Sequence, residues 1–191
     1  MQRLFLVRHG PTHAKGMIGW TDLPADLSDT AALSRLSAYL PSDARVVSSD
    51  LVRAVDTADA IQGGRARSPH NPALREMHFG RWENLTFKNL PPEDAALAKA
   101  FYEKPGDLAP PDGESWNAVC ARVSDAVDQA LSASTQDLIV VCHFGVILTQ
   151  LQRATGKSAY DTFAQKIDNL SATEVIIENG KWRAGAINHC P

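Results

Sequence analysis

The stretch LFLVRHGPT, residues 4–12, joins an apolar run to an abrupt charged end. Four consecutive apolar residues indicate a buried strand, which stops where an arginine, a histidine and a glycine follow. The same order returns in LIVVCHFG, residues 138–145, and RVVSSD, residues 45–50, is a shorter version that leads into a helical pattern. In an open α/β sheet, ligands bind at the carboxyl ends of the strands. We therefore expect one pocket to collect four side chains that are distant in sequence: Arg8, His9, Arg53 and His143.

The composition is typical of a folded chain without a broad charged surface. The chain has 191 residues, 44% of them hydrophobic, which indicates one domain spanning residues 1–191. The net charge is −3 and the two signs are interspersed, so we expect neither nucleic acid nor an anionic membrane as a partner. No apolar run approaches the ~18 residues of a membrane span, and the first residues carry no signal-peptide pattern. We therefore expect a cytoplasmic protein.

The three cysteines, Cys120, Cys142 and Cys190, are odd in number and widely spaced. This matches neither a disulfide framework nor a zinc site, so we expect reduced thiols. Cys142 lies on the predicted strand beside His143, where it is either a nucleophile or a small apolar side chain in the core. Packing is the interpretation that we favour, because free cysteine behaves as a small hydrophobic residue.

The spacing of apolar residues predicts alternating strands and helices. The expected strands are residues 4–7, 45–48 and 137–142, followed by a hairpin of 173–178 and 181–187 around Asn179-Gly180. The expected helices run from Ser28 or Asp29 to Pro41, from Ser49 or Asp50 to Gly63-Gly64, near 93–101, over 116–131 after a Ser115 cap, and over 146–154. We therefore expect an α/β three-layer sandwich in which helices flank a mixed, mostly parallel central sheet.

The segment LREMHFGRWE, residues 74–83, mixes four apolar residues with charged residues, a histidine and a glycine. We expect this segment to bury little and to lie over a cleft, with Glu76 as the candidate acid. In the loop after the first strand, Lys15 and His13 either line the rim of the pocket or are solvated.

The four converging side chains and Glu76 suit phosphoryl transfer. Two guanidinium groups and a helix N-terminus would hold a phosphate, and the arginines would keep a nucleophilic histidine neutral. A second histidine would donate to phosphate oxygens, and a carboxylic acid would protonate the leaving oxygen. No metal or other cofactor is required. His9 and His13 have the i, i+4 spacing of metal ligands, but Gly10-Pro11 argues against a helix there, so we expect no metal site.

Four blocks of sequence, in this order, resemble those of the histidine phosphatase superfamily, the phosphoglycerate-mutase-like family. They are RHGPT at 8–12, SSDLVRAVDTA at 48–58, LRE at 74–76 with FGRWE at 79–83, and His143 after its aliphatic strand, with GESW at 113–116 in addition. The resemblance covers nearly the whole chain. It implies that His9 is the phosphorylated nucleophile, that Arg8, Arg53 and His143 form the phosphate pocket, and that Glu76 is the proton donor.

Two departures from the family pattern concern the substrate. Lys15 stands where the family often has asparagine, and Phe144 stands where it often has the first glycine of His-Gly-Gly. With Thr12, these residues complete the set that we expect to contact a small phosphomonoester. The span between Glu76 and His143 is shorter than in family mutases, which favours hydrolysis. Mutase-type transfer and a non-catalytic phosphate-binding module remain alternatives, and the physiological substrate and oligomeric state stay open.

Overall fold

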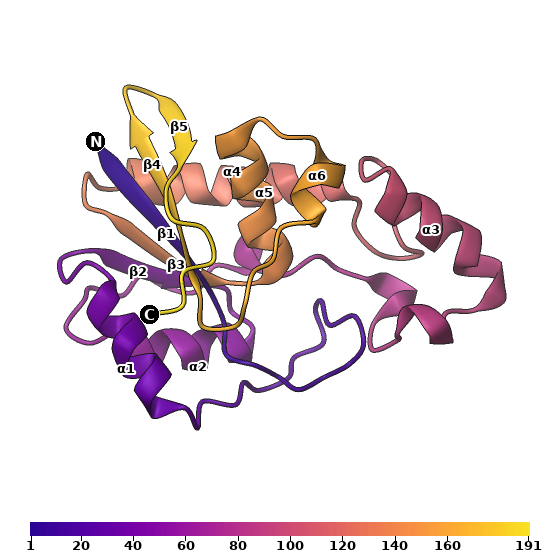
Figure 1. Cartoon of the computed structure of the whole chain (residues 1–191), viewed down its shortest axis with the longest axis horizontal. Coiled ribbons are helices and arrows are strands. Elements are labelled where there is room, and N and C mark those ends of the chain that lie inside the picture. The colour runs from indigo at the N-terminus through magenta and orange to yellow at the C-terminus, as the bar shows by residue number, and fades with distance from the viewer.

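The computed structural model describes residues 1–191 and shows a five-stranded sheet between two layers of helices (Figure 1). The strand order is β2-β3-β1-β4-β5; β2, β3 and β1 are parallel, and β4 and β5 form an antiparallel edge. The strands are β1 (Gln2–Arg8), β2 (Arg45–Ser48), β3 (Leu138–Cys142), β4 (Ala172–Glu178) and β5 (Lys181–Ala184). The helices are α1 (Thr30–Tyr39), α2 (Val52–Ile61), α3 (Ala95–Glu103), α4 (Trp116–Ser132), α5 (Phe144–Thr155) and α6 (Ala159–Phe163). The expected α/β sandwich with a mixed sheet is confirmed.

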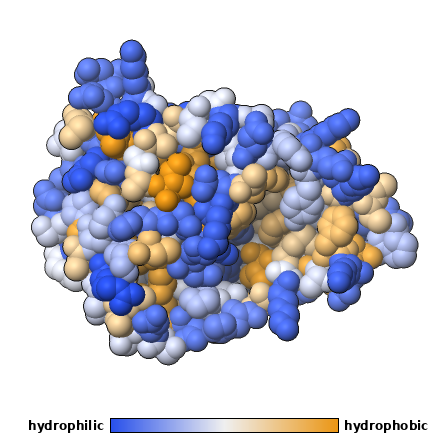
Figure 2. All heavy atoms as spheres, in the orientation of Figure 1, coloured by the Kyte–Doolittle hydropathy of each residue, from blue (hydrophilic) through white to orange (hydrophobic).

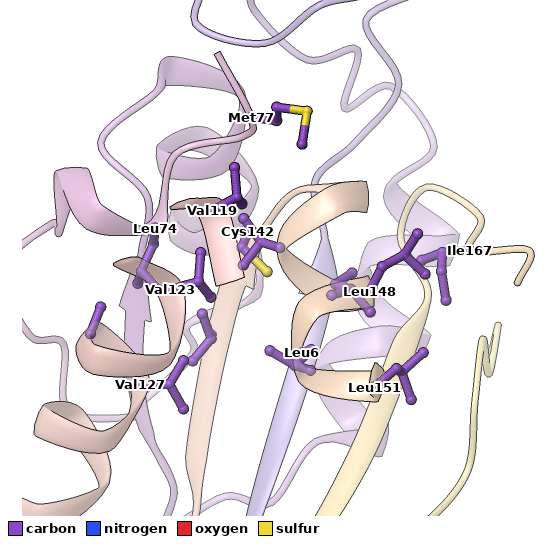
Figure 3. Close-up of a cluster of buried hydrophobic side chains, with 14 of the residues drawn as sticks. Leu6, Leu74, Met77, Val119, Val123, Val127, Cys142, Leu148, Leu151 and Ile167 are labelled. Atoms are coloured by element: carbon purple, nitrogen blue, oxygen red, sulfur yellow. The ribbon is translucent and has the colours of Figure 1, made fainter. Parts of the chain in front are cut away.

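The two helical layers follow from the alternation of side chains along the central strands. Leu4 and Leu6 of β1 face the layer that contains α4 and α5, whereas Phe5 and Val7 face α1 and α2. β3 is buried along its whole length because it lies between β1 and β2 with helices on both sides. Most of the face in Figure 2 is hydrophilic, with a hollow between α3 and the rest of the chain where hydrophobic side chains gather. Figure 3 shows part of the larger core, where leucines of α5 pack beside Leu6 and face the valines of α4.

The register of the parallel strands aligns their carboxyl ends. Arg8 of β1 pairs with Cys142 of β3, and Ser48 of β2 pairs with Val141 of the same strand. The residues that follow each strand therefore emerge at one edge of the sheet. No helix of the structure is both long and apolar enough to cross a membrane.

Several element boundaries differ from the prediction. α5 begins at Phe144, two residues before the apolar spacing resumes, because His143 occupies the N-cap position. The hairpin turn is confirmed, with positive φ at Asn179 and Gly180, but β5 ends at Ala184. The short helix α6 was not predicted.

The predicted caps are confirmed for two helices and wrong for one. Asp29 accepts from the Ala32 N–H and Ser115 from the Ala118 N–H. Neither Ser49 nor Asp50 caps α2. The carboxylate of Asp50 pairs with Arg75 instead, and Asp22 from the loop after β1 accepts from the N–H of Val52, the first residue of the helix.

The prediction that residues 74–83 bury little is wrong. Leu74, Met77 and Trp82 are buried in the core, and Trp82 is inaccessible to solvent. Short 3-10 helices at Pro72–Leu74 and Gly80–Trp82 turn the segment so that its apolar side chains point inward. The indole N–H of Trp82 donates to Asp94, which satisfies its polar atom inside the core.

Arg65 is a buried arginine that ties together the ends of α1 and α2. Neither helix has a basic residue in its last turn, so the carbonyl groups there need another donor. The guanidinium of Arg65 supplies it at distances of 2.6–3.2 Å. The acceptors are the carbonyl oxygens of Ser37, Leu40, Pro41, Ile61 and Gln62.

We predict that Arg65→Ala lowers the free energy of unfolding by about 2–4 kcal/mol, because several buried carbonyl groups lose their only charged donor. Urea unfolding followed by tryptophan fluorescence measures the change. Arg35→Ala is the matched control: Arg35 is an exposed arginine on α1 with one hydrogen bond, to the Pro191 carbonyl. Its effect should stay within about 0.5 kcal/mol. Equal unfolding midpoints for the two variants would contradict the capping role of Arg65.

Candidate active site

The imidazole rings of His9 and His143 lie beside each other at the carboxyl edge of the sheet, with ring centroids 5.1 Å apart. Each histidine directly follows a strand, and β1 and β3 are neighbours although about 130 residues of sequence separate them. The His9 N–H donates to the Cys142 carbonyl at 3.0 Å, which continues the ladder by one residue. The adjacency of the two strands therefore brings the two rings together.

The hydrogen bonds of His9 define its tautomer. Nδ1 lies 2.6 Å from the Gly10 carbonyl oxygen, which can only accept, so Nδ1 carries the proton. Nε2 lies 3.3 Å from Nε of Arg53, which can only donate, so Nε2 carries a lone pair. Burial, followed by the positive charge of Arg53, lowers the pKa of His9 from its usual 6.5 to about 3. His9 is thus a neutral imidazole whose Nε2 lone pair faces the Arg53 guanidinium.

Arg53 lies in the first turn of α2 and is inaccessible to solvent. Its Nη1 donates to the Thr21 carbonyl at 3.0 Å, and its Nη2 donates to the Gly19 carbonyl at 2.6 Å. These two acceptors belong to the loop after β1. The loop therefore fixes the plane of the guanidinium group that faces His9.

Arg8 is the last residue of β1 and directly precedes His9. Its Nη1 donates to the Ile167 carbonyl at 2.5 Å, and its guanidinium lies over the Phe144 ring, 5.4 Å from the ring centre. Its Nε is buried and has no hydrogen-bond partner. A buried donor without a partner is costly, so Arg8 is prepared to bind an acceptor from a ligand.

His143 is inaccessible to solvent, and neither of its ring nitrogens has a hydrogen-bond partner. Burial lowers its pKa well below the usual value, with further lowering from the neighbouring His9 and Arg53. A neutral imidazole has one N–H donor, and here that donor has nothing to bind. Together with Nε of Arg8, it forms a pair of unsatisfied donors around His9.

Glu76 is buried beside this cluster and is held by the N-terminus of α5. Both of its carboxyl oxygens lie 3.1 Å from the Gly145 nitrogen, and the Met77 N–H donates to Oε1. Burial raises the pKa of Glu76 above its usual value and outweighs these two donors, which favour the charged form. A Cβ at Gly145 would lie 2.5 Å from Oε1, so only glycine admits the carboxyl group in this position.

Two residues that hold the site in place were not predicted from the sequence. Arg122 of α4 donates to the carbonyls of Ala73 and Arg75 and pairs with Glu114, which anchors the segment that carries Glu76. A charged residue three positions after Val119, beside the apolar stripe of α4, was the signal that could have identified it.

Glu83 is the second of these residues. Its carboxylate accepts the backbone N–H groups of Gly19, Trp20, Thr21 and Phe79, and the Thr21 hydroxyl. It therefore fixes the loop whose carbonyls bind Arg53. Burial opposes its ionisation, yet these donors together hold the pKa of Glu83 below its usual value. The sequence contains no signal for this role, because the acceptor and its donors meet only in the fold.

The structure brings together Arg8, His9, Arg53, Glu76, His143 and Phe144. It does not bring all of the predicted rim residues into that cluster. Lys15 is exposed, Thr12 is half-buried, and no hydrogen bond or ion pair links either side chain to the cluster. His13 pairs with Asp26 in an exposed position, and the structure contains no metal-binding group of three or more His, Cys, Asp or Glu side chains.

Cys142, the alternative nucleophile considered from the sequence, and the tryptophans near the site have surroundings that indicate structural roles. The Cys142 thiol packs in the core, and burial raises its pKa, which opposes a role as a nucleophile (Figure 3). Trp82 and Trp116 are core residues. Trp20 is partly exposed, and its indole N–H donates to the Glu76 carbonyl.

The electrostatics of the cluster suit a dianion. Two arginines carry positive charge, both histidines are neutral, and burial favours the protonated form of Glu76. The pocket therefore combines two positive charges, unsatisfied donors, a lone pair on a nucleophilic nitrogen and a carboxylic acid. This combination can bind a tetrahedral oxyanion, form a bond to its central atom and protonate a departing oxygen.

Comparison with known proteins identifies relatives over most of the chain. A family model of the histidine phosphatase superfamily (branch 1) matches residues 4–189. The adenosylcobalamin/alpha-ribazole phosphatase of Salmonella typhimurium is 34% identical over 159 residues, covering 79% of this chain and 78% of that protein. The metal-independent phosphoserine phosphatase of Arabidopsis thaliana is 31% identical over 191 residues, covering 94% and 78%. The structure of Bacillus stearothermophilus YhfR, 24% identical, shares the fold with a TM-score of 0.89 and covers 100% of this chain and 98% of that one.

We predict that the imidazole of His9 stays neutral down to about pH 4 and titrates near its pKa of about 3. Replacing Arg53 with glutamine should raise this pKa, because removing a neighbouring positive charge makes protonation easier. NMR titration of the labelled imidazole measures both values, and Arg35→Gln on the exposed face of α1 is the control for loss of a distant arginine. Titration of His9 near 6.5 in the unchanged protein would contradict the buried, neutral nucleophile.

Proposed function

The chain belongs to the histidine phosphatase superfamily, and from this membership we propose that it is a metal-independent phosphomonoester hydrolase that acts through a phosphohistidine on His9. The observation that carries the proposal is the state of His9. Its Nδ1–H is held by the Gly10 carbonyl, and its Nε2 lone pair faces Arg53 in a buried cluster that also contains the unsatisfied donors of Arg8 and His143. A histidine that serves only in packing has no need of this arrangement.

The phosphate group would bind among Arg8, Arg53 and His143. Its oxygens satisfy Nε of Arg8 and the ring N–H of His143, which have no other partner. Arg53 uses three of its five N–H groups on His9, Gly19 and Thr21, so two remain for the phosphate. The bound dianion balances the two arginine charges. In the transition state its oxygens gain charge, and these donors already point toward those oxygens.

In the first step, the Arg53 Nε–H leaves Nε2 of His9 for a phosphate oxygen, and Nε2 attacks phosphorus in line with the ester oxygen. The N–P bond forms as the P–O bond to the leaving alcohol breaks, and Glu76 gives its proton to that oxygen. The ring then carries Nδ1–H and Nε2–P and is positively charged. The Gly10 carbonyl, 2.6 Å from Nδ1, stabilises this charge.

In the second step, the ionised Glu76 takes a proton from water while the water oxygen attacks phosphorus. The N–P bond breaks, inorganic phosphate leaves, and both His9 and Glu76 return to their starting states. The names of the two relatives described above support this direction of reaction, since both are phosphatases. One of those names also includes "metal-independent", in agreement with a mechanism that uses side chains alone.

We predict that the purified protein releases phosphate from p-nitrophenyl phosphate in the presence of excess chelator. His9→Ala should reduce kcat by at least about 10³-fold, because the covalent intermediate can no longer form. His13→Ala removes an exposed histidine from the following loop and should leave kcat within about twofold. Colorimetric release of p-nitrophenol measures all three reactions. Loss of activity in chelator, or an active His9→Ala enzyme, would reject the proposal.

The same preparation distinguishes hydrolysis from the alternatives. Incubation with 3-phosphoglycerate that yields free phosphate without 2-phosphoglycerate rejects mutase-type transfer. Phosphate binding without any detectable phosphohistidine or turnover favours a non-catalytic module.

We predict that Gly145→Ala reduces kcat by about 10²-fold, because its Cβ would displace the Glu76 carboxyl group from the position of a proton donor. Gly64→Ala is the matched control, since a Cβ there meets nothing within 4 Å. Steady-state kinetics with an alkyl phosphate, whose leaving group depends on protonation, provides the measurement. Normal turnover by a folded Gly145→Ala enzyme would exclude Glu76 as the donor.

A further inference from the structure

A cavity of about 240 Å³ opens beside the candidate active site, among α3, α4, α5 and α6. Apart from Glu76 and Gly145, every residue of its wall is hydrophobic. The wall includes Met77, Phe79, Tyr102, Trp116, Phe144 and Phe163. In Figure 2, hydrophobic side chains gather in the hollow between α3 and the rest of the chain.

The cavity reaches the proposed proton donor, the carboxyl group of Glu76. The carboxyl group of Glu76 forms part of the wall and also faces the charge of Arg53 and Arg8. Phe144 forms another part of the wall and lies beneath the Arg8 guanidinium. A group attached to an oxygen that receives the proton of Glu76 would therefore extend into this space.

The cavity offers almost nothing to a polar substituent. No lysine, arginine or histidine lines it. The Tyr102 hydroxyl already donates to the sulfur of Met17, and the Trp116 indole N–H donates to Gln152. A carboxylate, a second phosphate or a row of sugar hydroxyls would lose water there without gaining a partner.

The walls are formed by aromatic rings that support one another. Trp116 and Phe163 pack edge to face, with ring centroids 4.7 Å apart and planes at 85°. Tyr102 packs against Phe163 in the same manner at 6.4 Å. These contacts keep the cavity open without a ligand, and their hydrophobic surfaces favour an apolar or aromatic occupant.

We propose that this cavity binds the leaving group of the substrate, and that the leaving group is an aromatic or arylalkyl alcohol. The proposal rests on the phosphomonoester hydrolysis proposed above and specifies its substrate class. The volume exceeds the ~150 Å³ of a cavity that holds benzene, so one ring with a short linker, or two fused rings, can be accommodated. Burial of such a group supplies binding energy next to the reacting ester.

The test compares alkyl phosphates, so that the reactivity of the departing alcohol differs little between substrates. We expect kcat/KM for 2-phenylethyl phosphate to exceed that for glycerol 1-phosphate and for 3-phosphoglycerate by at least about tenfold, as burial of several apolar carbons implies. Phosphate release is measured for each ester under the same conditions. Equal or faster turnover of glycerol 1-phosphate or 3-phosphoglycerate would overturn the proposal while leaving hydrolysis itself intact.

Two variants on α6 provide a matched pair. Phe163→Ser removes a ring from the cavity wall and should lower kcat/KM for 2-phenylethyl phosphate about tenfold, with less than about a twofold change for glycerol 1-phosphate. Tyr160→Ser removes an exposed ring from the same helix and should change neither value. Parallel losses for both substrates in Phe163→Ser would assign Phe163 to general stability.

A binding measurement separates failure of this proposal from failure of the proposed function. If no ester releases phosphate, hydrolysis is rejected, and calorimetry with 2-phenylethylphosphonate and methylphosphonate still tests the cavity. Tighter binding of the arylalkyl phosphonate, with a more negative heat-capacity change, supports an apolar subsite. Equal affinity for the two phosphonates overturns it.

Discussion

The parallel pairing of β1 with β3 is the constraint on which the candidate site depends. Arg8 lies opposite Cys142, and the next residue of each strand is a histidine. A shift of one residue in this register would turn every side chain of one strand to the opposite face. The apolar alternation that fills both helical layers prevents such a shift, because both faces of β3 are buried. Packing of the core therefore determines the 5.1 Å separation of the two imidazole rings.

Burial of charge is the second feature of the site, and the surrounding backbone makes it possible. Arg53 is inaccessible to solvent, and an isolated charge there would be strongly unfavourable. The carbonyls of Gly19 and Thr21 satisfy part of the guanidinium, and Glu83 holds the loop that carries them. The positive charge so retained lowers the pKa of His9 and keeps its lone pair available. Loop structure and nucleophile chemistry are thus coupled through a single arginine.

The sequence was sufficient to predict the α/β sandwich and the meeting of His9 with His143, because both depend on strong apolar runs that end in distinctive residues. The support around them was not predictable in the same way. The Glu83 carboxylate serves donors some sixty residues earlier in the chain, and Asp22 rather than the adjacent Asp50 caps α2. Such pairings depend on loop geometry, which local secondary-structure propensity does not predict. The burial of residues 74–83 was not predicted for a related reason: their apolar side chains are irregularly spaced, and 3-10 turns direct them inward.

The first turn of α5 connects phosphate binding, proton transfer and substrate choice. His143 is the N-cap residue and faces His9, Phe144 supplies a wall of the apolar cavity, and Gly145 holds the carboxyl group of Glu76. These three residues are consecutive at one helix terminus, yet the His143 ring, the Phe144 ring and the Gly145 N–H contact different partners. Phe144 supplies no hydrogen-bond donor to a phosphate, although its ring lies against the Arg8 guanidinium. Gly145 cannot be replaced without moving the proposed proton donor, because any Cβ would meet Glu76. In a site built this way, selection can change the leaving group that is accepted while the groups proposed to carry out the chemistry remain in place.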